Sequence, residues 1–311
     1  MPNEIVPSAA PQLSVIIAVY GDWGPLARCL QSLRQQIAAP ECEVIIVDDG
    51  SEISAPESVR SWDGFPLRIV RQPHAGIPAA RNRGIQCSKG SVLVFTDADC
   101  LLQPGCLAAL SAVVADSPQH SCFQLCLAGD PSNAVGRAEE LRLMTFQKQM
   151  LQPNGSIRYL NTAGFAIRRE RAAAEVNLFD PSALRGEDTL LLANLMQRGE
   201  LPLFVPRAVV QHVISLPLLQ CLRKDVRSAW LEGRTYDLIA AKRVVIRMSK
   251  DERVAMLQEM WRAASHDSIG RIAWFVVVLR QGLQRFVSVI YRCRRLGTSA
   301  QPTPTAPTKS V

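Results

Sequence analysis

Acidic residues follow two short apolar segments, and they are the side chains of this sequence best suited to chemistry. Asp97 and Asp99 follow SVLVFT with only Ala98 between them, and Asp48 and Asp49 follow EVIIV. Adjacent carboxylates repel each other unless a cation or a donor satisfies them. Residues i and i+2 of extended backbone point to the same side, so Asp97 and Asp99 are expected to form a site for a hard divalent ion. The alternative is that these acids only cap the following helices, and it is strongest for Asp49.

Strands and helices must alternate to position these acids. Short apolar runs predict buried strands over 13–20, 43–51, 67–72 and 91–100. Helical spacing or a closing glycine predicts helices over 23–36, 77–90 and 104–116. This alternation indicates an α/β fold with a mostly parallel sheet and helices on both faces. Ligands bind beyond the carboxyl ends of the strands in such sheets, which is where the acids lie.

The pattern changes after about residue 120. We expect a strand over 120–129, a helix over 134–150, a strand pair over 156–168, a helix over 187–200, short strands broken by proline over 201–213, and mostly helix over 215–292. The predicted organisation is a flexible N-terminus at 1–12, a catalytic domain at 13–213, a helical basic region at 214–296 and a disordered tail at 297–311.

Composition and missing motifs exclude several classes of protein. The chain has 311 residues, of which 48% are hydrophobic and 20% charged, as in globular proteins. The N-terminus lacks the pattern of a signal peptide, and no apolar run reaches the ~18–20 residues of a membrane span. Neither GxGxxG nor GxxxxGK[ST] is present, so a dinucleotide-binding Rossmann site and a P-loop are unsupported.

Five segments in order carry a resemblance to a known family. They are LSVIIAVY, EVIIVDDGS, GIPAARNRG, VLVFTDADC and GEDTLL, and with the strands around them they cover roughly 13–213. In this order and spacing they resemble the family 2 glycosyltransferases, which have the GT-A fold. The resemblance implies inverting transfer of a sugar from a nucleotide-diphospho-sugar to an acceptor hydroxyl. It also implies Mg²⁺ or Mn²⁺ as cofactor and a donor that is more often a uridine nucleotide than another.

The resemblance assigns expected roles to individual residues. The nucleotide-sugar would be bound by Ala18, Tyr20, Asp49, Arg71, Arg81 and Asp97. The metal would be bound by Asp97, Asp99 and His212. Asp188 matches the general base, with Glu187 orienting its neighbours, and the acceptor side would involve Asn161, Thr162 and Gly164.

Two departures from the family pattern bear on the base site. Ala18-Val19-Tyr20-Gly21 replaces the common Pro-x-Tyr-Asn, which removes one contact to the nucleobase. His74 precedes Ala75-Gly76 where an Asn is common, and it either faces the donor or is solvated.

Charge is unevenly distributed along the chain. Residues 1–219 hold 18 basic and 21 acidic residues, whereas the rest holds 17 basic and 7 acidic. The segment 270–295 mixes Trp274, Phe275 and Phe286 with arginines, which suits a helix lying on an anionic membrane. The alternative is a helix packed on the catalytic domain with solvated arginines. Aromatic residues are only 6% and do not alternate with basic ones, so nucleic acid is not an expected partner.

The leading hypothesis is thus a cytoplasmic glycosyltransferase at the inner face of the plasma membrane, acting on a saccharide or lipid-linked acceptor in polysaccharide or glycolipid synthesis. Two alternatives remain open. One is a non-catalytic sugar-nucleotide-binding or scaffold protein of the same fold, and the other is a nucleotidyltransferase.

Overall fold

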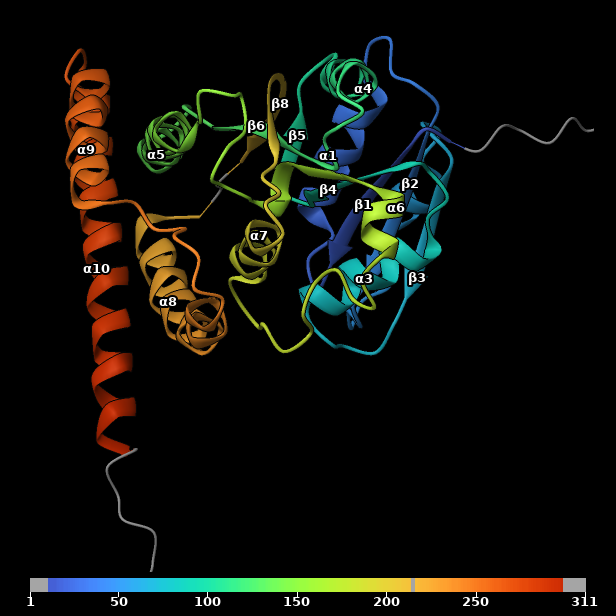
Figure 1. Cartoon of the computed structure of the whole chain (residues 1–311). Coiled ribbons are helices and arrows are strands. Elements are labelled where there is room, and N and C mark those ends of the chain that lie inside the picture. The colour runs from blue at the N-terminus through green and yellow to red at the C-terminus, as the bar shows by residue number, and fades with distance from the viewer. Residues whose placement is uncertain (1–10, 214–215, 299–311) are drawn as a thin grey trace, which may run out of the picture.

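The structure is a computed structural model that describes residues 11–213 and 216–298 (Figure 1). A single curled sheet with helices on both faces forms its body, and the last three helices lie together at one side. The expected flexible N-terminus at 1–12 and disordered tail at 297–311 lie almost wholly outside the described residues.

Eight strands form the sheet, in the order β3-β2-β1-β4-β7-β6-β8-β5. They are β1 (Leu13–Val19), β2 (Cys42–Asp48), β3 (Leu67–Arg71), β4 (Val92–Asp97), β5 (Cys100–Leu102), β6 (Cys122–Gly129), β7 (Phe165–Arg168) and β8 (Leu203–His212). The first four in sheet order are parallel to one another. β7 is antiparallel to both β4 and β6, β8 is parallel to β6, and β5 is antiparallel to β8. The sheet is therefore mixed, with the parallel half that the sequence predicts.

The helices follow the predicted alternation. They are α1 (Gly24–Arg34), α2 (Glu57–Arg60), α3 (Ile77–Cys87), α4 (Cys106–Asp116), α5 (Ala134–Met150), α6 (Arg169–Ala173), α7 (Glu187–Gln197), α8 (Leu218–Ala241), α9 (Lys250–Ala264) and α10 (Ser268–Thr298), with a 3₁₀ turn at Thr162–Gly164. The predicted α/β body and helical C-terminal region are thus confirmed.

Alternation along the central strands divides the core into two layers. Val15 and Ile17 of β1 face one side of the sheet, where α1 and α4 pack. Ile16 faces the other side, where α3 and α7 pack. Strands buried on both faces read as continuous apolar runs, which explains the composition of LSVIIAV.

A third, smaller core joins the C-terminal helices to the body. Ala138 and Leu141 of α5 pack against Met256 and Met260 of α9 and against Val276 of α10. One face of α10 is therefore a packed structural face, as the second sequence interpretation expects.

Three local expectations were wrong. The proline at 206 does not break β8, because a register shift against β6 places it in a bulge, where a missing N–H is tolerated. The strand pair over 156–168 is reduced to β7, because the 3₁₀ turn precedes it. The segment 91–100 is not one strand: β4 ends at Asp97, and Ala98 and Asp99 form a turn before β5.

The membrane-span expectation also needs correction. Within α10, the helix from Ser268 to Arg294 is long and apolar enough to cross a membrane by length and composition. Arg271, Arg280, Arg285, Arg292 and Arg294 interrupt this segment, so no long uninterrupted apolar run marks it in the sequence. One such helix is weak evidence for a span.

Close packing of α3 on β1 gives the first prediction. A Cβ at Gly84 would lie 2.4 Å from Cγ2 of Ile16, so Gly84→Ala should lower the free energy of unfolding by about 1–3 kcal/mol. Gly282, an exposed helical position of α10 with no atom within 4 Å of such a Cβ, is the control. Gly282→Ala should raise the free energy of unfolding by up to about 1 kcal/mol. Denaturant titration measures the free energy of unfolding of both variants. A Gly84→Ala variant as stable as Gly282→Ala would contradict this packing.

Candidate active site at the carboxyl edge of the sheet

The ends of three neighbouring parallel strands bring the predicted acidic segments together. Ala18 near the end of β1 is in register with Val47 of β2 on one side and with Asp97 of β4 on the other. Asp49 follows β2 directly, and its N–H donates to the carbonyl of Val19. The strand order therefore places Ala18, Asp49 and Asp97 on one edge, as the sequence predicts.

Asp49 holds the loop that leads into α3. Its carboxylate accepts hydrogen bonds from the N–H groups of Ala75 (3.0 Å) and Gly76 (2.9 Å) and from the Gln72 amide (2.7 Å), and it lies 2.9 Å from His74 Nδ1. The carboxylate is buried and both oxygens are occupied. Asp49 therefore does not cap α2 or α3, which both lack a side-chain cap; its carboxylate fixes the loop before α3 and is not a free acceptor.

Two exposed rings lie beside Asp49. The Tyr20 ring is 59% exposed and stacks on the His74 imidazole with centroids 4.0 Å apart and an angle of 20°. His74 thus belongs to this edge and is not a separate solvated loop residue. The stacked pair offers an aromatic face of the kind on which a nucleobase packs.

Arg71, the last residue of β3, contacts the end of β2 and the residues that follow it. Its guanidinium donates to the Ser51 carbonyl at 2.7 Å and lies 3.6 Å from the Asp48 carboxylate. The side chain remains half exposed at the rim of the edge. This leaves part of its donor set open toward a ligand.

Arg81 joins the acidic segment after β4 to the one at the start of α7. Its guanidinium is buried and donates to Asp97 Oδ1 at 2.9 Å and to Glu187 Oε1 at 2.7 Å. The Phe179 ring lies against it, 5.6 Å from the guanidinium carbon. Arg81 was expected beside the donor; its observed contacts make it the residue that fixes the end of β4 against the start of α7.

Asp97 and Asp99 have different surroundings, because Ala98 and Asp99 form a turn. The premise that both project from extended backbone was therefore wrong. Asp97 bonds Arg81 and is 41% exposed. Asp99 instead faces His212, whose Nε2 lies 3.3 Å from Asp99 Oδ2.

The antiparallel half of the sheet brings His212 to this place. Cys100 of β5 is in register with His212 at the end of β8, and the Val213 N–H donates to the Asp99 carbonyl at 3.0 Å. Burial alone would lower the pKa of His212, but hydrogen bonds to Asp99 and Glu139 raise it to about 10. Burial opposes ionisation of Asp99 as well, yet His212 holds the pKa of that carboxyl below its usual value.

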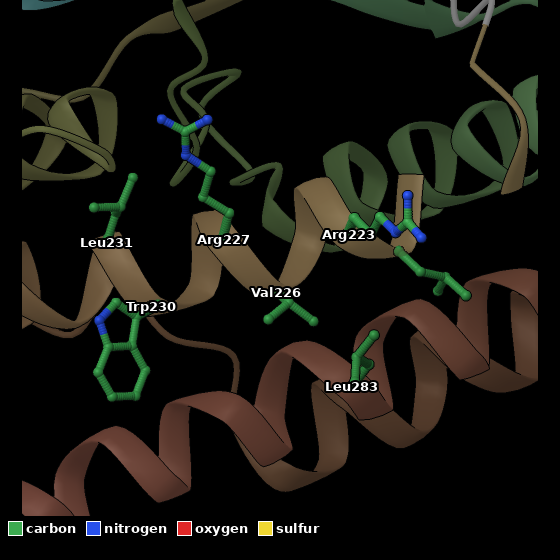
Figure 2. A pocket seen from close by; sticks show the side chains of 7 residues that line it. Arg223, Val226, Arg227, Trp230, Leu231 and Leu283 are labelled. Carbon is green, nitrogen blue, oxygen red and sulfur yellow. The ribbon is translucent and has the colours of Figure 1, made fainter. Parts of the chain in front are cut away.

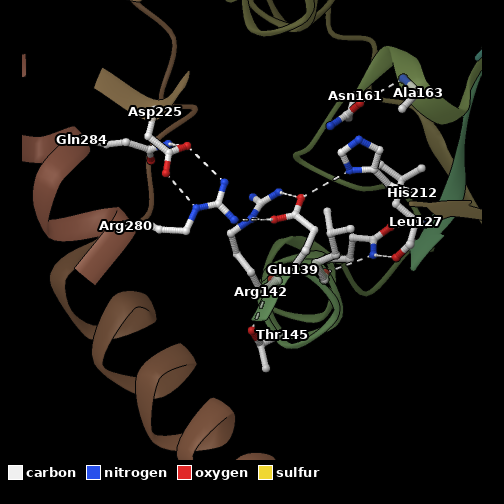
Figure 3. Close-up of polar contacts among 12 residues, drawn as sticks. Leu127, Glu139, Arg142, Thr145, Asn161, Ala163, His212, Asp225, Arg280 and Gln284 are labelled. Carbon is white, nitrogen blue, oxygen red and sulfur yellow. Dashed lines mark hydrogen bonds and ion pairs between the residues drawn. The ribbon is translucent and has the colours of Figure 1, made fainter. Parts of the chain in front are cut away.

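Glu139 is a site residue that the sequence did not reveal. It lies on α5, is buried, and has an oxygen 3.9 Å from His212 Nδ1 (Figure 3). In the sequence it resembles a surface acid paired with Arg142 three residues on. The tertiary contact that buries it leaves no local signal.

The donor set fits a divalent ion in kind. Among the residues that the structure describes, no group of three His, Cys, Asp or Glu side chains forms a preassembled metal cage. Two donors, the Asp99 carboxylate and the His212 imidazole, do face each other, with Asp97 two residues away. Mg²⁺ uses one or two carboxylates and takes its other ligands from water and substrate phosphates, so an incomplete cage is sufficient.

Asp188 has the properties of a base. Burial raises its pKa to about 7, and the adjacent Glu187 carboxylate adds to the rise. It is the second residue of α7 and accepts from the N–H of Thr189 at 2.7 Å. A carboxyl group with such a pKa can accept a proton near neutral pH.

The expected acceptor residues mostly serve packing. Thr162 and Gly164 are buried, and a Cβ at Gly164 would lie 2.7 Å from a Leu127 methyl carbon. Asn161 is partly exposed, but its side chain caps the 3₁₀ turn by accepting from the Ala163 N–H at 2.9 Å. The assignment of Asn161, Thr162 and Gly164 to the acceptor side stays a prediction.

Comparisons with known proteins identify the family of this chain. The model of Glycosyl transferase family 2 matches residues 14–176. The putative glycosyltransferase EpsH of Bacillus subtilis is 33% identical over 96 residues, which cover 30% of this chain and 28% of EpsH. The chain thus spans about a third or less of the length of the first curated relatives that it matches.

Two solved structures resemble most of the chain. The mannosyltransferase PcManGT of Pyrobaculum calidifontis, in complex with GDP-Man and Mn²⁺, has a TM-score of 0.57 at 16% identity and covers 95% of this chain and 89% of its own. TarS 1–349 of S. aureus, in complex with UDP, has a TM-score of 0.54 at 16% identity and covers 91% and 92%. These likenesses define the fold, which is GT-A. With the family match, they show that this chain belongs to glycosyl transferase family 2.

The buried guanidinium of Arg81 gives the second prediction. Arg81→Met should destabilise the protein by about 3–5 kcal/mol, because Glu187 would be left as a buried carboxylate without its cation. Arg83→Met, an exposed change on the same helix, should have little effect and is the control. Thermal and denaturant unfolding compare the two. Equal stability of both variants would show that the ion pair does not hold α7 in place.

Proposed function

We propose that this chain is a metal-dependent inverting glycosyltransferase that moves a sugar from a nucleotide-diphospho-sugar to an acceptor hydroxyl. The observation that carries the proposal is the convergence of two acidic segments on Arg81. One segment holds the carboxylates Asp97 and Asp99, and the other holds Asp188 with its raised pKa. Donor binding and proton removal need different carboxylates, and this arrangement supplies both.

We expect the donor to be a uridine nucleotide. The stacked rings of Tyr20 and His74 provide a face for the base, and Ala18 at the strand end leaves room beside them. Arg71 at the rim has donors for the nucleotide. TarS was crystallised with UDP and PcManGT with GDP-Man, so both nucleotides belong in a donor screen.

The metal would be Mg²⁺ or Mn²⁺, held by Asp99 and His212 with Asp97 beside them. When bound, a divalent ion stabilises the charge that develops on the departing nucleoside diphosphate. Structural neighbours crystallised with Mn²⁺ support this part of the proposal. Arg81 orients Asp97 by its 2.9 Å hydrogen bond, so the carboxylate keeps its position before the donor arrives.

Asp188 would accept the proton of the acceptor hydroxyl. A hydroxyl is a poor nucleophile near neutral pH, so a positioned base is needed. Glu187 is held by Arg81 at 2.7 Å and acts through its charge, which helps to raise the pKa of Asp188. One such base suffices for a single displacement with inversion.

Donor turnover distinguishes this proposal from its two alternatives. A glycosyltransferase releases nucleoside diphosphate, a nucleotidyltransferase releases pyrophosphate, and a binding or scaffold protein releases neither. The presence of both acidic segments, together with the raised pKa of Asp188, favours a catalytic protein. We place the reaction in polysaccharide or glycolipid synthesis, with a saccharide or lipid-linked acceptor.

Replacing the proposed base gives the third prediction. Asp188→Asn should lower turnover by about 10²–10⁴ and leave UDP affinity nearly unchanged. Asp116→Asn, an exposed change at the end of α4, should affect neither. In the wild type, kcat/KM should fall as the pH drops through about 7, because protonated Asp188 cannot accept a proton. The variants keep the residues that act electrostatically on the Asp188 carboxyl, which are Glu187, Arg81, Arg185 and Tyr159. A collapse of UDP affinity with normal residual turnover would assign Asp188 to donor binding instead.

The C-terminal helices provide a surface that suits an anionic membrane, and we propose that the protein docks there, at the inner face of the plasma membrane. One side of α10 packs on the body, but its other side exposes apolar residues: Ile269, Ile272, Phe275, Leu279, Phe286 and Val289. A groove of about 460 Å³ lies next to it, between α8 and α10 (Figure 2). Its lining is Leu222, Arg223, Val226, Arg227, Trp230, Leu231 and Leu283, which includes two arginines and no acid. Acyl chains and anionic headgroups match this lining.

Membrane docking gives the fourth prediction. Removing α10 would uncover the core it forms with α5 and α9, so substitutions on its exposed side are the better test. The wild type should sediment with phosphatidylglycerol vesicles at low salt and dissociate at high salt. Phe275→Glu/Phe286→Glu should weaken this binding at least about tenfold, because each carboxylate opposes insertion and anionic lipid. Val176→Glu, at a 97% exposed position of the body, should not. A wild type that stays in solution at low salt removes the membrane from the proposal.

A further inference from the structure

Charged side chains connect His212 to the C-terminal helices (Figure 3). His212 lies between two carboxylates, with Nε2 3.3 Å from Asp99 and Nδ1 3.9 Å from Glu139. Glu139 in turn contacts Arg142 of its own helix and Arg280 of α10. The members of this series come from α5, β8 and α10. Tertiary packing, and not local sequence, therefore brings them together.

Glu139 is held rigidly as a carboxylate. Arg142 donates to both of its oxygens, at 3.0 and 2.5 Å, and Arg280 lies 3.8 Å away. The carboxylate is thus fixed by two arginines, with one oxygen 3.9 Å from Nδ1 of the His212 ring.

Arg280 has a second partner that fixes its place. Asp225 of α8 is buried and accepts from Arg280 at 2.7 and 3.0 Å, and Gln284 donates to the same carboxylate at 3.1 Å. α8 and α10 therefore help to hold the Glu139 carboxylate in place. The helices proposed to meet the membrane also belong to the support of the metal site.

We infer that Glu139 is a positioning residue for the metal: its carboxylate, 3.9 Å from Nδ1 of His212, favours the proton on that nitrogen and so leaves Nε2, beside Asp99, as the ligand atom. This inference rests on the proposed metal dependence. An imidazole that binds a metal through one nitrogen commonly donates its other N–H to a carboxylate, which fixes the tautomer and the ring orientation. Here Glu139 and Asp99 lie on opposite ring nitrogens, as this role requires.

The experiment is Mn²⁺ binding to the full chain without donor, measured by titration calorimetry and by the loss of the free Mn²⁺ signal in electron paramagnetic resonance. Glu139→Gln should weaken Mn²⁺ binding about 10–100-fold. Glu140→Gln is the matched control, because Glu140 is the next residue of α5 and pairs with Arg137 instead; it should stay within twofold. Glu139→Asp, which keeps a charge for the arginines but retracts it from His212, should weaken binding in the same direction.

A double-mutant cycle separates positioning from a general structural role. In a His212→Ala background, Glu139→Gln should cause no further loss of Mn²⁺ affinity, since its effect passes through the imidazole. A further loss in that background, or wild-type affinity in both Glu139 variants, overturns the inference. A wild type that binds no Mn²⁺ overturns the proposed metal dependence itself, and normal binding by His212→Ala overturns the assignment of His212 as a ligand.

Discussion

The arrangement of the site depends on one buried cation. Arg81 lies under the carboxyl edge with a carboxylate on either side, Asp97 from β4 and Glu187 from α7. A buried guanidinium is costly without partners, and so is the buried Glu187 carboxylate, so these two groups require each other, and the partly exposed Asp97 gives Arg81 a second contact. These contacts fix the turn after β4, where we propose the metal, relative to the helix that carries Asp188. Neither segment contacts the other through backbone pairing, so the side chains have to make the connection.

The two halves of the sheet contribute different parts of the site. The parallel half places the ends of β1, β2 and β4 together and so forms the proposed base and diphosphate site. The antiparallel half, through the pairing of β5 with β8, returns the chain to Asp99 with His212 at its end. The C-terminal helices then complete the surroundings of His212 through α5. The acidic body and the basic C-terminal third thus meet at one ionic network rather than forming separate units.

The sequence predicted the parts that depend on local pattern. Buried strands read as apolar runs, and their order places the acids of 48–51 and 97–99 on one edge because parallel strands share their carboxyl ends. It failed where tertiary contacts decide. Glu139 looks like a solvated acid three residues from Arg142, since nothing nearby in the sequence announces His212 or Arg280 as partners. The turn at Ala98 and Asp99 was missed because β5 is only three residues long and pairs with a strand more than 100 residues later. The acceptor side is harder to predict, because the small residues Thr162 and Gly164 suit both an accessible backbone and a tightly packed turn.

The long sequence separations across the site have a kinetic consequence. Arg81 meets Glu187 across 106 residues, and His212 meets Asp99 across 113. Loop closure over such distances costs conformational entropy before the contact repays it, so these contacts are expected to form late in folding. Strands β1 to β4 can pair first, from chain that is nearer in sequence. A partly folded molecule would therefore have the sheet edge at which we propose the nucleotide binds, but not the contacts of Glu187 and His212 with that edge. The complete site would form only in the last cooperative step of folding.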